Sequence, residues 1–97
     1  MNTLAGTITT VEKELLDRTH FPQQEVLIGN EQINRRNYEA QRAMKLGNSF
    51  KDKVKIVFED DEGIKIVETT VWGMTDNYLM LKRGTTLPLC RIHEIII

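Results

Sequence analysis

The chain has 97 residues, of which 40% are hydrophobic and 28% are charged; this length accommodates one domain with a modest core but not two domains. Its 13 Lys and Arg residues and 14 Asp and Glu residues give a formal net charge of -1, so no field of the whole molecule attracts nucleic acid or an anionic membrane. Any binding of that kind must depend on a local patch of charge.

The single cysteine, Cys90, has no partner within the chain for a disulfide, which favours a reducing compartment. Residues 1–16 lack the positively charged start and the continuous apolar stretch of a secretory signal, and no apolar run is long enough to span a bilayer. We therefore expect a cytoplasmic protein that makes no membrane contact.

The N-terminal stretch predicts at most a short helix. Residues 1–8 mix small and polar side chains, and we expect them to be frayed or loosely packed. Thr9 and Glu12 have the spacing of a capping box, which predicts a helix over about residues 10–18. Pro22 ends this element, since the residue before a proline is pushed away from helical backbone angles.

A longer helix is predicted over about residues 31–46, where apolar side chains recur on one side. Gly47-Asn48 supplies the residues for a left-handed stop. The charged side chains of this stretch fall mostly on the opposite side, as in an ordinary solvated face. The buried stripe is expected to consist of Ile33, Ala40, Ala43 and Met44.

From Lys53 onward the apolar period changes to two, which predicts strands. Short β-branched runs separated by tight turn signals are typical of a small meander that curls into a barrel. The first run begins at Val54, the second extends over Ile64–Trp72, the third over Tyr78–Lys82, and the last over Ile92–Ile97.

The residues between these runs predict how the strands are connected. The acidic residues 59–63 have the composition of a solvated hairpin loop, which Gly63 closes with a positive φ. The second run does not keep strict alternation, which predicts a bend or bulge near residues 68–70. Pro88 belongs at an edge or strand end, and residues 89–91 suit a single tight turn before the closing strand.

Two resemblances accompany this pattern. The order Gly84, Leu87-Pro88, Ile92 and Ile95 is similar to the way in which the peptide-binding Src-homology-3 barrels enter their last strand through a one-turn helix. In those barrels a proline-rich ligand lies on clustered aromatic side chains. Here Arg91 stands where one of the expected tyrosines would be.

The order Asp61-Glu62-Gly63, Gly73, Asp76 and Tyr78–Leu81 resembles the first half of the motif of Sm-like barrels. In that motif an asparagine holds a base, and Met80 occupies about its place here. The Arg-Gly pair of the motif is replaced by Arg91-Ile92. The whole chain, with NRRNYEAQRAMKLGN joined to VKIVFEDDEG and ETTVWG, is also similar to short uncharacterised bacterial proteins.

We therefore expect an α+β protein with one compact domain. Residues 1–50 would form an N-terminal helical arm, and residues 51–97 a small, strongly bent, five-stranded antiparallel β-barrel of the Src-homology-3-like or Sm-like kind. The two resemblances cover residues 54–97 and imply the barrel.

The residues offer little for catalysis or metal binding. Cys90 with His93 or His20 is the available nucleophile and base, but no oxyanion loop accompanies them. The Cys90-x-x-His93 spacing supplies two of the four ligands that zinc requires. The glycines are spaced as turn residues and do not form a phosphate-binding loop. We expect no catalytic residues, no metal and no cofactor, and an enzyme is the third choice of function.

Association with itself or with a protein partner is the favoured function, because a barrel of this size buries too little apolar surface to be stable alone. The oligomer edge would be Ile95, Ile96 and Ile97. The alternative is an RNA-binding regulator of the Sm-like type with Trp72 or Tyr78 as a stacking surface. Its basic patch, which would equally serve a protein partner, would consist of Arg35, Arg36, Arg42, Lys45, Lys82, Arg83 and Arg91.

Overall fold

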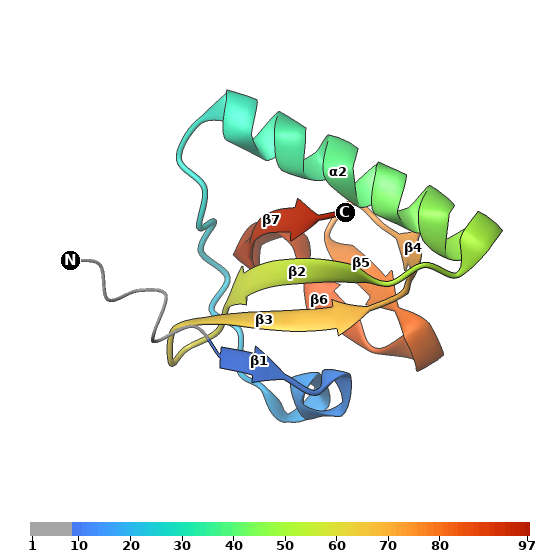
Figure 1. Cartoon of the computed structure of the whole chain (residues 1–97). Coiled ribbons are helices and arrows are strands. Elements are labelled where there is room, and N and C mark those ends of the chain that lie inside the picture. The colour runs from blue at the N-terminus through green and yellow to red at the C-terminus, as the bar shows by residue number, and fades with distance from the viewer. Residues whose placement is uncertain (1–8) are drawn as a thin grey trace.

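The computed structural model describes residues 9–97 and has an α+β architecture (Figure 1), which confirms the predicted class. One α-helix of this part, α2 (Asn30–Phe50), lies across two β-sheets, one of four strands and one of three. No ladder among the described residues closes the sheets into one barrel, so the barrel stays a prediction. The expectation for residues 1–8 falls outside the described residues.

The four-stranded sheet has the order β1-β3-β2-β7. Its central strand, β2 (Val54–Glu59), is antiparallel to both β3 (Ile64–Thr69) and β7 (Ile92–Ile96). The edge strand β1 (Thr9–Val11) runs parallel to β3. The N-terminal segment thus contributes a strand to the sheet that the C-terminal half builds.

The predicted capping box at Thr9 is wrong. Val11 is paired with Val67 of β3, which is buried, so residues 9–11 are extended and cannot form a helical turn. The following element, η1 (Lys13–Arg18), is a 3-10 helix, and no side chain caps its start at Glu12. Pairing with an existing sheet edge satisfies the backbone of so short a segment better than an isolated helical turn does.

The three-stranded sheet has the order β4-β5-β6, with β4 (Val71–Met74), β5 (Tyr78–Leu81) and β6 (Thr86–Pro88). One residue, Thr70, separates β3 from β4, and the predicted bend at this point is confirmed. Residues 69–71 are consecutive and all buried, because the chain turns here and changes the face that it presents to the core.

The short connections follow the sequence closely. Gly63 closes the hairpin with a φ of 146°. Pro88 is the last residue of β6, and the predicted single turn before β7 is the 3-10 turn η3 (Leu89–Arg91). The third strand ends at Leu81, and the turn η2 (Lys82–Gly84) follows it.

Contrary to the prediction, the acidic hairpin loop is solvated only in part. Asp60 is 3% exposed, and its Oδ1 accepts hydrogen bonds from the amides of Glu62 and Gly63 at 2.8 and 3.1 Å. Its Oδ2 accepts one from the Lys65 Nζ at 2.6 Å. Burial raises the pKa of Asp60, but these three hydrogen bonds outweigh it and hold the pKa below the ordinary value. Asp60 therefore organises the loop, while Asp61 and Glu62 are exposed.

Helix α2 does not stop at Gly47-Asn48, contrary to prediction. It continues to Phe50 and ends at Lys51, whose φ of 57° is left-handed and whose amide donates to the Gly47 carbonyl. Gly47 instead permits close packing, because a Cβ atom there would lie 2.1 Å from the carbonyl oxygen of Val71 in β4. The glycine lets the helix approach the strand.

The buried face of α2 differs from the predicted stripe in one important residue. Ala40 and Ala43 are buried as expected, and Ile33 and Met44 are half-buried. Arg36 is buried as well. One core is shared by both sheets beneath the helix, and its largest fully buried side chains are Phe58, Ile56, Leu79, Leu81, Leu87, Ile92, Val67 and Val71.

Candidate binding cleft

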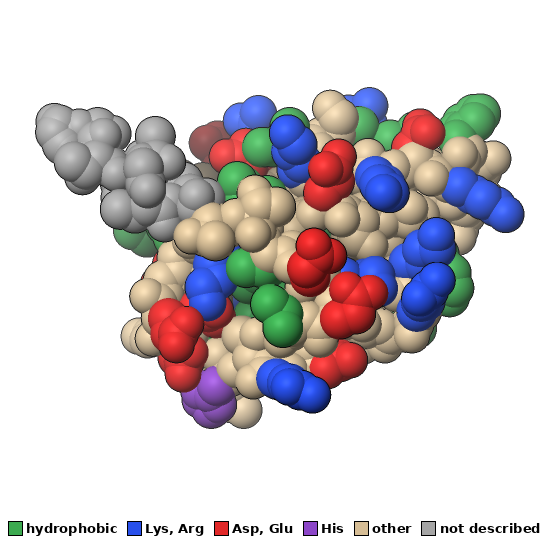
Figure 2. Space-filling view, turned by 60° about the horizontal axis from the view of Figure 1, so that its bottom comes forward, with side chains coloured by type: hydrophobic (Ala, Val, Ile, Leu, Met, Phe, Trp, Pro, Cys, Tyr) green, Lys and Arg blue, Asp and Glu red, His purple; other side chains and the backbone are tan. Residues whose placement is uncertain are grey.

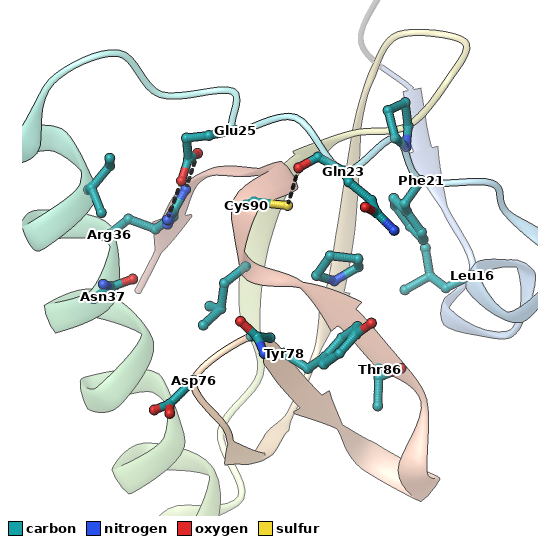
Figure 3. Close-up of a pocket in the computed structure, with 15 residues that line it drawn as sticks. Leu16, Phe21, Gln23, Glu25, Arg36, Asn37, Asp76, Tyr78, Thr86 and Cys90 are labelled. Carbon is teal, nitrogen blue, oxygen red and sulfur yellow. Dashed lines mark hydrogen bonds and ion pairs between the residues drawn. The ribbon is translucent and has the colours of Figure 1, made fainter.

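A cleft of about 810 Å³ opens between α2, the connecting segment that leads into it (residues 19–29), and the sheet β4-β5-β6 (Figure 3). Its lining is partly apolar and partly polar, and the helix and the sheet each contribute residues of both kinds. The apolar lining includes Leu16, Phe21, Pro22, Ile33, Pro88 and Leu89, and the polar lining Gln23, Glu25, Arg36, Asn37, Asp76, Asn77, Tyr78 and Thr86.

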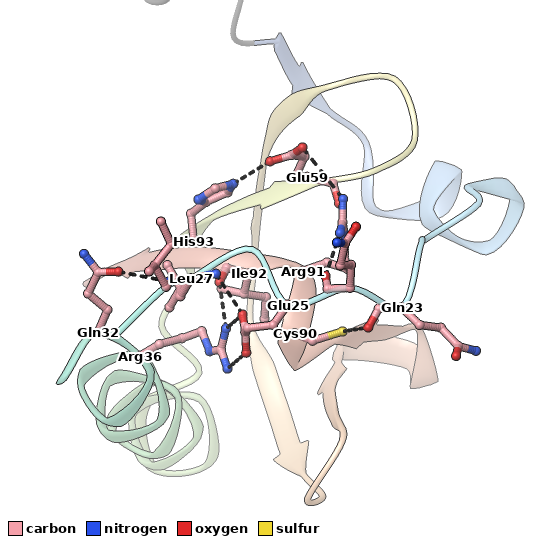
Figure 4. A network of polar contacts seen from close by, with 12 residues as sticks. Gln23, Glu25, Leu27, Gln32, Arg36, Glu59, Cys90, Arg91, Ile92 and His93 are labelled. Carbon is pink, nitrogen blue, oxygen red and sulfur yellow. Dashed lines mark hydrogen bonds and ion pairs between the residues drawn. The ribbon is translucent and has the colours of Figure 1, made fainter. Parts of the chain in front are cut away.

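The connecting segment has no regular secondary structure, and an ion pair between the buried Arg36 and the partly exposed Glu25 fixes it to the helix (Figure 4). The Arg36 guanidinium donates to both carboxylate oxygens of Glu25, at 2.7 and 2.9 Å, and to the carbonyl of Ile92 at 3.2 Å. This bidentate pairing is the strong form of an ion pair. Arg36 therefore joins the connecting segment, α2 and β7.

The environment of Glu25 keeps this pair charged. Burial raises the pKa of the Glu25 carboxyl, but hydrogen bonds from the Arg36 guanidinium and the Leu27 amide outweigh burial and hold the pKa below its ordinary value. Glu25 is therefore ionised at neutral pH, and the connecting segment stays attached to the helix.

Arg91 provides a second attachment of the same segment. Its Nε donates to the Glu59 carbonyl at 3.0 Å, and one terminal nitrogen donates to the Gln24 carbonyl at 2.7 Å. The Glu59 carboxylate lies 2.9 Å from the His93 Nε2 (Figure 4). The Val26 amide also donates to the Cys90 carbonyl at 2.9 Å. These contacts hold the rim of the cleft in place on β2, η3 and β7.

Two buried polar atoms beside the cleft have no hydrogen-bond partner among residues 9–97: the Nε of Arg36 and the Oδ1 of Asn37. One is a donor and the other is an acceptor, and they belong to consecutive residues of α2 that both line the cleft. Buried polar groups in folded proteins are nearly always paired. The Arg36 Nε lacks an acceptor and the Asn37 Oδ1 lacks a donor, and an amide ligand carries both kinds of group.

The sheet side of the cleft presents an aromatic ring and a carboxylate. Tyr78 is 46% exposed, and Figure 3 shows it across the cleft from the helix that carries Arg36 and Asn37. Asp76 is exposed and takes part in no ion pair within the described chain. The cleft therefore has a stacking surface and one negative charge available to a ligand.

The seven basic residues of the predicted patch do not share one surface. Arg36 and Arg91 are buried, because their guanidinium groups hold the connecting segment. Arg35 is exposed on α2 and pairs with Glu39 at 3.5 Å. The other exposed members lie in two places: Arg42 and Lys45 on α2, and Lys82 and Arg83 at η2.

The two predicted stacking residues are both about half exposed, but they lie in different hollows. Tyr78 lines the cleft, whereas Trp72 lines a groove with Lys51 and Lys82. The predicted oligomer edge is also divided: Ile95 is buried in the core, while Ile96 and Ile97 are 45% and 50% exposed.

The catalytic candidates are engaged separately. The Cys90 Sγ donates to the Gln23 carbonyl at 3.6 Å, and His93 faces Glu59. Within residues 9–97, no group of three His, Cys, Asp or Glu side chains has the arrangement of a metal site.

Asn37 was missed by the sequence reasoning, although a signal exists. It follows Ile33 by one helical turn and precedes Ala40 by another, so it lies within the apolar stripe of α2. A polar side chain at such a position needs a partner. No comparable signal points to Asp76, because its placement beside the helix depends on the packing of two elements.

Comparisons with known proteins identify no relative: the chain matches no family model, no curated protein and no solved structure. Within residues 9–97, no helix combines the length and the apolar character that a membrane crossing requires.

Proposed function

We propose that this protein is a non-enzymatic, cytoplasmic binding module that associates with a protein partner by taking an extended peptide segment into the cleft between α2 and β5–β6. The observation that carries the proposal is that Arg36 and Asn37, which both line the cleft, keep an unpaired donor and an unpaired acceptor, while other lining residues are apolar. Each peptide unit carries a carbonyl acceptor and an N–H donor, the two kinds of group that these atoms lack.

The rest of the cleft supports the same class of ligand. Its volume of about 810 Å³ falls within the usual range of ligand sites, roughly 300–1,000 Å³. Phe21 and Pro88 offer contact to an apolar side chain, and Tyr78 offers a ring with a hydroxyl, a combination common at protein interfaces. The Asp76 carboxylate favours a ligand with a basic side chain next to the apolar one.

The arrangement of the strands supports a further proposal about the fold, a strongly bent barrel of the Src-homology-3-like or Sm-like kind. The sets β7-β2-β3 and β4-β5-β6 are joined between β3 and β4 by the single residue Thr70, so one bent strand would serve both sheets. The 3-10 turn η3 leads into the last strand. In such a barrel the cleft would lie between the helix and the outer strands.

A peptide library displayed on phage and selected against the whole protein tests the proposal. We expect enrichment of sequences with an apolar residue near a basic one. Asn37→Ala and Tyr78→Ala should each weaken binding of a selected peptide roughly tenfold, the equivalent of about one lost buried hydrogen bond or aromatic contact. Trp72→Ala is the matched control, since Trp72 is equally exposed but lies outside the cleft, and it should leave binding unchanged.

Failure of the library to enrich any family of sequences, or equal binding by all three variants, would rule out the cleft as the site. Sedimentation of the protein alone separates the other form of association. A dimer that Ile96→Lys dissociates would place the contact on the exposed end of β7 and not in the cleft.

A further inference from the structure

A second hollow, of about 470 Å³, surrounds Trp72, the only tryptophan of the chain. None of its lining residues also lines the peptide cleft, and none is acidic. Trp72 is 48% exposed, so part of its aromatic ring is accessible to a ligand. We name this hollow the Trp72 groove, and it is lined by Gly47, Asn48, Lys51, Thr70, Trp72 and Lys82.

Hydrogen bonds fix the backbones of the two lysines in the groove. Lys51 ends α2 in a left-handed conformation, and its amide donates to the Gly47 carbonyl at 3.1 Å. The Lys82 amide donates to the Thr70 carbonyl at 2.9 Å. Two cations on fixed backbones therefore share a hollow with an exposed aromatic face, while their long side chains stay free to reach a ligand.

Further cations lie beyond the groove, together with carboxylates. An adjoining hollow shares Thr70 and Lys82 with it and adds Lys53 and Arg83 to the lining, together with Lys13, Glu12, Glu14 and Glu68. Within residues 9–97, none of the cations Lys51, Lys53, Lys82 and Arg83 takes part in an ion pair. Figure 2 shows Lys and Arg side chains gathered toward one end of the molecule, the end at which α2 finishes in Figure 1.

We propose that the Trp72 groove binds a single strand of nucleic acid, with a base stacked on the indole and the flanking phosphates on Lys51 and Lys82. Single strands are held by the combination found here, an aromatic platform for a base beside cations that follow the backbone. A base inside a duplex is already stacked and would not reach the indole. Because the net charge of the protein is -1, this binding depends on the local cations alone.

The number of cations sets the expected response to salt. Each phosphate contact on a single strand contributes about -0.7 to the slope of log K against log salt concentration. The two contacts from Lys51 and Lys82 give a slope of about -1.4, so that raising monovalent salt from about 50 to about 200 mM weakens binding roughly sevenfold.

The test uses a fluorescently labelled oligouridylate, about 12 nucleotides long, and fluorescence anisotropy at low salt. Trp72→Ala should weaken binding roughly tenfold, as removal of a stacking partner does, and Lys51→Glu with Lys82→Glu should remove it. Lys45→Glu is the control for charge, because Lys45 is exposed on α2 but lines a different hollow. Tyr78→Ala is the control for the peptide cleft, and neither control should change affinity more than twofold.

Quenching of the intrinsic fluorescence of Trp72 on addition of unlabelled oligonucleotide provides an independent reading from the wild-type protein. Absence of binding at about 25 mM salt, where phosphate contacts are strongest, overturns the proposal. It is equally overturned if heparin, which has no bases, quenches Trp72 and competes as well as the oligonucleotide while Trp72→Ala has no effect. Loss of binding in Tyr78→Ala but not in Trp72→Ala would assign the oligonucleotide to the cleft and refute both proposals.

Discussion

Replacement of Gly47 by alanine should destabilise the protein, although alanine is the better helix former. In an exposed helix interior, Gly→Ala stabilises by about 1 kcal/mol. Here the added Cβ would lie 2.1 Å from the Val71 carbonyl oxygen and 3.1 Å from the Thr70 Cγ2. The carbonyl belongs to the backbone of β4 and cannot rotate away as a side chain does.

The helix and β4 would have to separate by about 1 Å to restore an ordinary contact. Overpacking of this kind costs about 1–3 kcal/mol or more, and the separation would also disturb the buried Ala40 and Ala43 on the same face of α2. We expect a net loss of about 2 kcal/mol in the free energy of unfolding. For a domain of this length the melting temperature should fall by roughly 8–16 °C.

Thermal and urea denaturation, followed by far-ultraviolet circular dichroism, measure the effect. Asn48→Ala is the matched control, because it is the next residue of the same helix but is exposed. It should raise stability by about 0.5 kcal/mol through helix propensity. If Gly47→Ala were as stable as the wild type or more so, the close contact between α2 and β4 would be refuted.

Three further changes test the polar interior. Arg36→Met removes the partner of the Glu25 carboxylate, which is a third exposed and can be hydrated. Urea denaturation should therefore show a loss of about 2 kcal/mol in the free energy of unfolding, less than the roughly 3–5 kcal/mol typical of a fully buried pair. A loss under about 0.5 kcal/mol would contradict the pairing. Asn37→Ala removes a buried unpaired acceptor from a helix and should raise the free energy of unfolding by about 0.5 kcal/mol while it weakens peptide binding. A less stable variant would mean that the Asn37 Oδ1 has a partner within the chain. Asp60→Asn should cost about 2 kcal/mol at pH 7 through loss of the charged bond to Lys65. Folding lowers the pKa of Asp60. Its contribution to stability is therefore complete above about pH 4 and is lost as the pH falls through the lower pKa of the folded state. The difference in stability between the wild type and Asp60→Asn should shrink in acid, and a constant difference down to about pH 2 would contradict the lowered pKa.

The features that the sequence determined by itself are local ones. The alternation at Val54, Ile56 and Phe58 fixes which face of β2 is buried, because side chains of a strand alternate between faces. The break of that alternation after Val67 reveals the bend at Thr70, and Pro88 marks the end of β6 and the turn before β7. Each of these depends on the backbone preferences of a few neighbouring residues.

The tertiary structure decided whatever depends on residues far apart in the chain. Gly47 has the signature of a helix stop, but contact with β4 carries the helix past it. The sequence predicts Arg36 and Arg91 as part of a basic surface. In the structure both are buried, because they bond to the Glu25 carboxylate and the Gln24 carbonyl of the connecting segment. A cation is exposed unless a partner compensates its desolvation, and for both arginines that partner lies at least 11 positions away along the chain.

The candidate sites also depend partly on local sequence and partly on tertiary packing. Trp72, Tyr78 and Lys82 were recognisable from the sequence as residues with chemistry to offer, but their assignment to two separate hollows follows from how α2 lies over β4 and β7. Local preferences specify which segments form helices, strands and turns. The position of a side chain relative to a cleft is set by the packing of whole elements, because only packing brings residues such as Asn37 and Tyr78 to the same place.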